Sequence, residues 1–121
     1  MLVKYGKSLD DCIRCPACQG DYIHHDTVTI FERETEDAPS RAIVIERIGR
    51  VSNITGAQAE RGNPSSRRNG VAVRFWCEDC DVISELTLEQ HKGNTLLRWR
   101  SVSDTKRDEP PPLSIVRRVS Q

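Results

Sequence analysis

Alternating apolar and polar positions predict strands over much of the chain. The clearest alternation falls in residues 70–77, 82–91 and 95–102. In residues 95–102, Leu97 and Trp99 fall on one face, whereas Arg98 and Arg100 fall on the other. Gly93 and Asn94, which both tolerate positive φ, predict a hairpin turn between the last two segments.

Two further segments, residues 22–34 and 41–48, are rich in β-branched side chains and complete the predicted sheet. Helical patterns are weak, and the best candidate is a short helix that would begin at Ser8 and continue through Asp10 and Asp11. We therefore predict a mostly β protein built on an antiparallel sheet of about five strands.

Turn-forming residues and prolines divide the chain into a domain, a loop and a tail. Residues 1–102 are predicted to form one domain, in which residues 49–70 make a long irregular loop. Residues 103–121 read as a flexible, proline-rich tail. Within this tail, residues 113–116 are apolar enough to dock as an edge strand or to bind a partner.

Two Cys-x-x-Cys pairs carry the strongest chemical signal. Cys15 and Cys18 form the first pair, Cys77 and Cys80 form the second, and 58 residues separate the pairs. Four thiolates are the donor set of a closed, structural Zn²⁺ site, and the ring of Pro16 helps to preset the first turn. Hydrophobic residues make up only 36% of the chain, so we expect zinc to offset a thin core.

Other residues leave alternatives to this ligand set. Cys12 extends the first pair to Cys-x-x-Cys-x-x-Cys, so it competes with Cys15 or Cys18 as a ligand. That spacing also resembles part of an iron–sulfur signature, although the nearby fourth cysteine is missing, and a redox dithiol is a further alternative. His24 and His25 follow the first pair, but adjacent strand residues point to opposite faces, so we do not expect them to form a catalytic cluster with Asp26.

The overall charge and hydropathy limit the function classes. The 18 basic and 18 acidic residues cancel, which argues against an indiscriminate nucleic-acid coat. The apolar runs are far shorter than a membrane span, and the first residues carry no signal-peptide pattern. We therefore expect a cytosolic protein without a membrane partner, in a compartment where paired cysteines are more often metal ligands than disulfides.

Basic residues and one tryptophan suggest a binding face. Arginine and tryptophan together hold phosphates and stack on bases, and Trp76 shares its strand face with Arg74. The alternative is that the tryptophans pack in the hydrophobic core and the arginines line the solvent-exposed face of a sheet. The predicted nucleic-acid or partner-binding residues are Arg67, Arg68, Arg74, Trp76, His91, Lys92, Arg98 and Arg100.

Three stretches of the chain, together with the Cys-Pro-Ala-Cys turn, carry a resemblance to a known group of proteins. They are residues 63–70, 74–80 and 90–95, which read NPSSRRNG, RFWCEDC and QHKGNT. Over residues 12–100 the chain resembles small zinc-ribbon proteins of unassigned function from bacteria, phages and mobile elements. The resemblance implies a zinc ribbon of four cysteines on a β-rich body.

These observations lead to two main functional hypotheses, and an enzyme with an unrecognised site is a third. The first is a small cytosolic zinc-ribbon module, not an enzyme, that contacts nucleic acid or a nucleic-acid enzyme. The alternative is a phage or mobile-element protein that binds and modulates a host protein. The sequence does not indicate an oligomeric state.

Overall fold

The computed structural model describes residues 12–106, with side chains described as far as Val102. The short helix predicted at Ser8 and the tail after Lys106 lie outside the described residues. No helix in the described part is long and apolar enough to cross a membrane.

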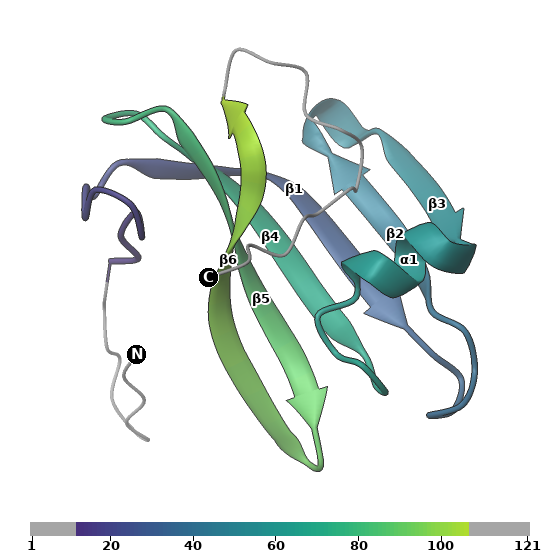
Figure 1. Cartoon of the computed structure of the whole chain (residues 1–121). Coiled ribbons are helices and arrows are strands. Elements are labelled where there is room, and N and C mark those ends of the chain that lie inside the picture. Colours follow the sequence, from purple (N-terminus) through teal and green to yellow (C-terminus); the bar gives the residue numbers. More distant parts are fainter. Residues whose placement is uncertain (1–11, 107–121) are drawn as a thin grey trace, which may run out of the picture.

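A single antiparallel sheet of six strands forms the body of the protein (Figure 1). Its order is β3-β2-β1-β4-β5-β6, so β1 lies in the interior between β2 and β4. The mostly β prediction is confirmed, with six strands instead of about five. The elements in chain order are β1 (Ile23–Glu32), β2 (Arg41–Glu46), the 3₁₀ turn η1 (Arg47–Gly49), β3 (Val51–Thr55), α1 (Gly56–Gly62), β4 (Gly70–Cys77), β5 (Val82–His91) and β6 (Asn94–Lys106).

The prediction of an irregular loop over residues 49–70 was wrong. This segment contains the end of η1, edge strand β3 and helix α1, and only Arg50 and residues 63–69 lie outside these elements and β4. Val51 and Ile54 supply the strand signal, but the turn-forming residues around them hid it. Strand β6 also runs to Lys106, four residues past the predicted domain boundary at residue 102.

The hairpin turn between β5 and β6 lies one residue earlier than predicted. Lys92 and Gly93 both have positive φ, 49° and 85°, and Asn94 already belongs to β6. Positive φ at both central residues defines the type I′ turn, whose twist matches that of the flanking strands.

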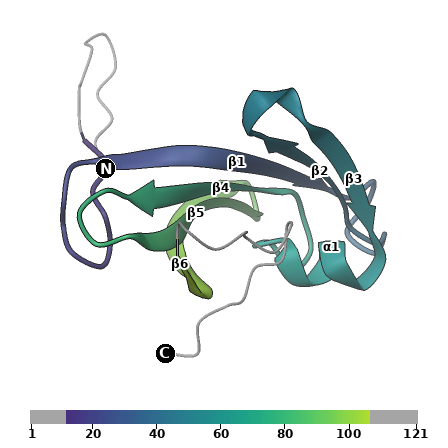
Figure 2. The ribbon, with the colours of Figure 1, turned by 90° about the horizontal axis from the view of Figure 1, so that it is seen from above.

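Helix α1 covers one face of the sheet, against β2 and β3 (Figure 2). A small apolar core lies between them and contains Phe31, Ala42, Val44, Ile54, Ala59 and Ala72. Further along the same face, towards β5 and β6, many of the buried residues are polar or charged, among them Thr27, Arg74, Glu85 and Thr87, beside the apolar Ile83 and Val102. We call this side of the sheet the helix face.

Ion pairs neutralise the buried charges of the helix face. The Nε atom of Arg74 lies 2.9 Å from Asp26, and the Nε atom of Arg100 lies 2.7 Å from Glu85. Arg100 also donates to the carbonyl oxygen of Gly62, at 2.7 Å, and thereby ties β6 to the end of α1. Buried polar groups are tolerated when they are paired in this way.

Candidate functional site

The two cysteine pairs meet at one end of the sheet. Cys15 and Cys18 lie in the turn before β1, whereas Cys77 ends β4 and Cys80 lies in the β4–β5 turn. The register explains the meeting, because Ile23 at the start of β1 pairs with Cys77 at the end of β4. The four Sγ atoms lie within 4.8 Å of one another and form a group that is compatible with metal binding.

The distances between sulfurs match tetrahedral coordination and exclude disulfides. Cys15 and Cys80 are 3.7 Å apart at Sγ, and Cys18 and Cys77 are 3.6 Å apart. A tetrahedron with metal–sulfur bonds of about 2.3 Å has edges of about 3.8 Å. A disulfide bond is only about 2.0 Å long, so these thiols are placed as ligands and not as bonded pairs.

Both turns have the same backbone geometry. The N–H groups of Gln19 and Asp81 donate to the carbonyl oxygens of Cys15 and Cys77, each at 2.9 Å. Gln19 and Asp81 each follow the second cysteine of their pair, and their φ angles are 67° and 62°. This left-handed residue closes each turn, so the two sulfurs of a pair face the same point.

Backbone N–H groups also point at the sulfurs. Ala17 donates to Cys15 Sγ and Gly20 donates to Cys18 Sγ, both at 3.4 Å. A Cβ atom at position 20 would displace the exposed carboxylate of Asp79 and press on Cys18 Sγ, so glycine lets the two turns approach closely. Such N–H···S contacts stabilise thiolates, the form of cysteine that binds metals.

The thiol pKa values indicate what a bound cation would do in this cluster. Burial raises the pKa of Cys80 to about 12, and the neighbouring thiols Cys77, Cys18 and Cys15 add to this effect. Burial also tends to raise the pKa of Cys15, but hydrogen bonds from the backbone N–H groups of Cys18 and Ala17 outweigh this effect. The pKa of Cys15 is therefore lowered. Four thiolates this close repel one another, so a bound cation is what allows all four to be deprotonated.

Cys12 and the histidines lie outside the four-sulfur group. Cys12 is exposed and is not among the clustered ligands. His24 is hydrogen-bonded to Glu78 and stacks on Trp76, with ring centroids 4.4 Å apart. His25 instead meets Phe75 edge to face, at 6.2 Å. The two adjacent histidines therefore have different partners, as their alternation predicted.

The opposite end of the sheet holds a loop with many internal contacts, residues 63–69. The amide of Asn63, which is buried, donates to Ser40 Oγ and to the carbonyl oxygen of Arg68, both at 2.9 Å. Its Oδ1 accepts from the N–H of Ser65 at 2.9 Å, and Ser65 Oγ donates to the carbonyl of Gln90 at 3.0 Å. The loop is therefore fixed both to itself and to the end of β5.

Arg33, the residue after β1, clamps the loop. Its guanidinium donates to the carbonyl oxygens of Ser65 and Ser66, at 3.3 and 3.0 Å, and to that of Ala38. Glu60 of α1 completes this network by accepting from Arg33 at 2.9 Å and from the N–H of Ser40 at 2.6 Å. A charged clamp of this kind restricts the backbone of the loop.

This network predicts a pH dependence. The N–H of Ser40 and the guanidinium of Arg33 lower the pKa of Glu60 below its ordinary value of 4.5. Glu60 thus stabilises the fold fully above pH 4.5, and we expect this contribution to be lost as the pH falls through its lowered pKa. An NMR pH titration should show the Ser40 amide shifting with Glu60. In Glu60→Gln that transition should disappear, and its persistence would contradict the assignment.

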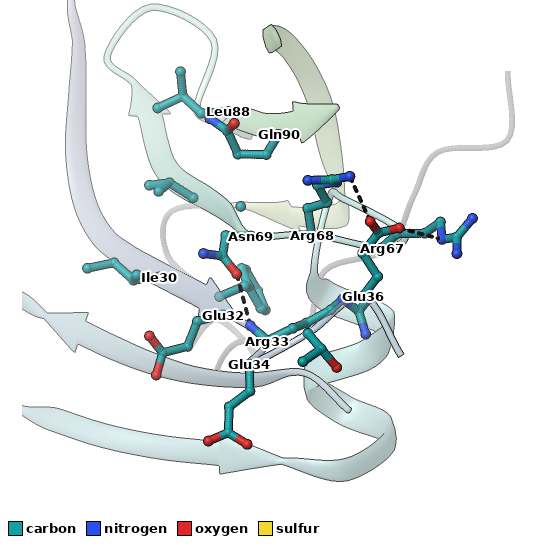
Figure 3. A pocket seen from close by; sticks show the side chains of 14 residues that line it. Ile30, Glu32, Arg33, Glu34, Glu36, Arg67, Arg68, Asn69, Leu88 and Gln90 are labelled. Atoms are coloured by element: carbon teal, nitrogen blue, oxygen red, sulfur yellow. Dashed lines mark hydrogen bonds and ion pairs between the residues drawn. The ribbon is translucent and has the colours of Figure 1, made fainter. Parts of the chain in front are cut away.

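An open cavity of about 770 Å³ lies beside the loop (Figure 3). Ile30, Val71 and Leu88 form part of its wall, and Arg67 and Arg68 stand at its margin. Both arginines pair with Glu36, Arg67 at 3.3 Å and Arg68 at 2.7 Å. The cavity therefore combines an apolar wall with a charged margin.

The structure places only half of the predicted binding residues at one end of the sheet. Arg67 and Arg68 lie in the loop, which is hydrogen-bonded to Gln90 at the end of β5, and His91 and Lys92 follow Gln90 in the β5–β6 hairpin; all four are exposed. We call these four residues the basic end. Trp76 lies near the four-sulfur group at the opposite end of the sheet, stacked on His24.

The other three predicted binding residues do not join this group. Arg98 is exposed and pairs with Glu89. Arg74 and Arg100 do share the strand face that was predicted, but their side chains are only 9% and 10% exposed and are held in ion pairs. The interpretation of these two arginines as a nucleic-acid surface is therefore corrected.

Sequence reasoning did not identify the residues that hold the loop. Asn63 followed by Pro64, with serine two residues later, is the signature of an Asx turn and ends α1. This signal was available in the sequence. The clamp by Arg33 was not, because it joins residues about thirty positions apart.

Comparison of the chain with protein-family models, with curated proteins and with solved structures found no match in any of the three.

Proposed function

We propose that the protein is a zinc-stabilised module that binds nucleic acid through the basic end. The metal half of the proposal rests on the four thiols, whose spacing and backbone N–H contacts suit Zn²⁺ better than a harder cation. Four protein ligands fill a tetrahedral site and leave no position for a substrate. The metal would therefore support the fold, and the role would be binding rather than catalysis.

One observation carries the binding half of the proposal: the two arginines of the basic end are presented by a loop whose backbone is held by hydrogen bonds. Asn63, Ser65 and Arg33 hold the backbone of residues 63–69, so little conformational entropy would be lost when Arg67 and Arg68 meet a ligand. Guanidinium groups bind phosphate oxygens with two parallel hydrogen bonds. The expected ligand is the phosphate backbone of a nucleic acid, which the protein would bind with little preference for base sequence.

Glu36 sets the strength of this interaction in the free protein. Its carboxylate occupies both guanidinium groups, so a phosphate must displace it. We therefore expect Glu36→Gln to bind nucleic acid more tightly than the wild type. A reduced affinity in Glu36→Gln would count against phosphate as the ligand.

The central test removes the two loop arginines. We expect Arg67→Ala/Arg68→Ala to bind a single-stranded or duplex oligonucleotide at least about tenfold more weakly at low salt. The slope of log affinity against log salt should also fall by about 1.4 to 1.8, because two phosphate contacts are lost. Fluorescence anisotropy between about 20 and 200 mM salt measures both quantities.

A matched control separates a defined site from general attraction. Arg47→Ala/Arg50→Ala removes the same charge from the β2–β3 connection, where Arg50 pairs with Glu46. This variant should bind as the wild type does. Equal weakening in both double variants, or no binding of the wild type at low salt, would refute the nucleic-acid proposal.

A further inference from the structure

The face of the sheet opposite α1 is almost entirely apolar. The strand register defines two rows of side chains that run across all six strands. The first row is Val51, Ile45, Val28, Val73, Leu86 and Trp99. The second row is Asn53, Ile43, Ile30, Val71, Leu88 and Leu97. We call these twelve positions, eleven of them apolar, the open face.

Side chains of the open face are exposed well inside the sheet, not only at its edges. Ile30 on β1 is 40% exposed, Ile43 on β2 is 38% exposed and Leu88 on β5 is 37% exposed. Figure 2 shows α1 on one side of the sheet, and none of the elements in residues 12–106 packs over the middle of the other side. The two apolar rows of the described chain therefore face solvent.

The two ends of the open face are polar or already covered. Beyond the second row, Glu32 pairs with Arg41, and Gln90 lies opposite Thr95. Beyond the first row lies Phe75, which packs edge to face on Trp99 of that row at 5.7 Å; both line a narrow gap with Pro16 of the first cysteine turn. The open face is thus an apolar band with defined limits, as in an interface core bordered by a polar rim.

The sheet face that carries the band is large enough for a stable interface. Six strands about 4.8 Å apart span about 24 Å, and the eight residues of β4 span about 26 Å, so the whole face has a projected area of roughly 600 Å². The two apolar rows fill roughly the middle half of this face, and the polar positions beyond them form the rim. A stable interface buries about 800 Å² of accessible surface on each partner, and a sheet surface that is corrugated by side chains has a larger accessible surface than its projected area.

We propose that the open face binds the open face of a second copy of this chain, forming a homodimer in which two sheets pack face to face. Neither row contains a charged side chain, so the matching surface must itself be apolar, and a two-fold axis supplies such a surface. The net charge of zero removes long-range repulsion between copies. Sheets packed about 10 Å apart with nearly aligned strands are a common arrangement of this kind.

The segments outside the described residues are each too short to do the same. Residues 1–11 contain Met1, Leu2, Val3, Tyr5 and Leu9, and residues 107–121 contain Leu113, Ile115, Val116 and Val119 after three prolines; charged residues interrupt both segments. One short segment covers the width of one or two strands, whereas the open face spans six. A second copy therefore fits the area better than either segment.

Analytical ultracentrifugation of the full chain tests the proposal, together with variants that place a charge in the band. The wild type should sediment as a dimer at micromolar concentration. Ile43→Lys and Leu88→Lys should raise the dimer dissociation constant by about 30-fold or more, because each buries a lysine in the interface core. Both variants should keep the wild-type metal content and circular dichroism spectrum.

Ile48→Lys is the matched control. Ile48 is fully exposed in the η1 turn, outside the open face, so its replacement by lysine should leave the dimer intact. Three results would overturn the proposal: a wild type that stays monomeric at all concentrations, folded lysine variants that dimerise as tightly as the wild type, or equal weakening by Ile48→Lys. A fourth result would also overturn it: a monomeric wild type whose open face binds an apolar dye only after residues 107–121 are deleted. In that case the deleted segment, and not a second copy, covers the open face.

Discussion

Replacing Cys77 by serine is expected to leave the chain without a cooperative fold. Cys77 is buried, ends β4 and lies 3.6 Å from Cys18 at Sγ, so its loss removes one of four ligands and the link between the two turns. Structural zinc supplies on the order of 10 kcal/mol or more of binding energy that becomes folding energy. The free energy of unfolding of a small domain is only about 5 to 15 kcal/mol, so most of it should be lost.

Cys12→Ser provides the matched control. It makes the same chemical change at an exposed cysteine outside the four-sulfur group, and it should keep the wild-type melting temperature and metal content. Elemental mass spectrometry should find one zinc per chain in the wild type and in Cys12→Ser. A chelator should abolish the β signal in circular dichroism. A well-dispersed NMR spectrum and cooperative melting of metal-free Cys77→Ser would contradict a structural metal.

The size of the expected effect follows from how little else holds this end of the sheet. The apolar core lies at the other half of the molecule, beneath α1. Near the four-sulfur group, the described contacts include the Phe75–Trp99 and His24–Trp76 ring pairs, the hydrogen bond between His24 and Glu78, and a hydrogen bond from the N–H of Glu78 to the carbonyl oxygen of Tyr22. None of these contacts involves residues 15–19 of the first turn, so we expect metal binding by the four sulfurs to hold that turn on the sheet.

The parts of the fold that the sequence predicted are those encoded by local pattern. The alternation placed Leu97 and Trp99 opposite Arg98 and Arg100, and the register of β5 and β6 agrees. The spacing of the cysteines predicted their grouping, because a two-residue gap positions both sulfurs of a pair regardless of the rest of the fold. The alternation and the cysteine spacing are each encoded by residues that are close together in the sequence.

Alternation does not tell which face of the sheet is covered. The usual expectation buries the face with Val, Ile and Leu and leaves arginines in water, yet Arg74 and Arg100 are buried while Ile30 and Leu88 are exposed. The helix face is covered by α1 and by the loop of residues 63–69. The positions of both depend on contacts between residues that are far apart in the sequence. If two copies meet through the open face, the usual expectation holds for the dimer rather than for the single chain.

Replacing Arg100 by alanine is expected to lower the free energy of unfolding by about 3 to 5 kcal/mol. The substitution leaves the carboxylate of Glu85, which is 6% exposed, without its closest cation, and it also removes the hydrogen bond to Gly62 that anchors α1. Urea unfolding followed by circular dichroism measures the change. Arg98→Ala is the matched control, because Arg98 lies on the same strand and its ion pair with Glu89 is 63% exposed on the arginine side. That variant should lose no more than about 1 kcal/mol.

The loss in Arg100→Ala should depend on pH with a defined sign. Burial raises the pKa of Glu85 above its ordinary value of 4.5, and the charge of Arg100 opposes this rise. Without Arg100 the pKa of Glu85 in the folded state should rise further. The folded state then binds more protons than the unfolded state between pH 4.5 and that raised pKa, so stability falls as the pH rises through this window. The deficit of Arg100→Ala relative to the wild type should therefore be largest at neutral pH and should shrink towards pH 4.5. A deficit that is constant over this range would show that Glu85 is not the group left unpaired, and that the lost contact to Gly62 accounts for the effect.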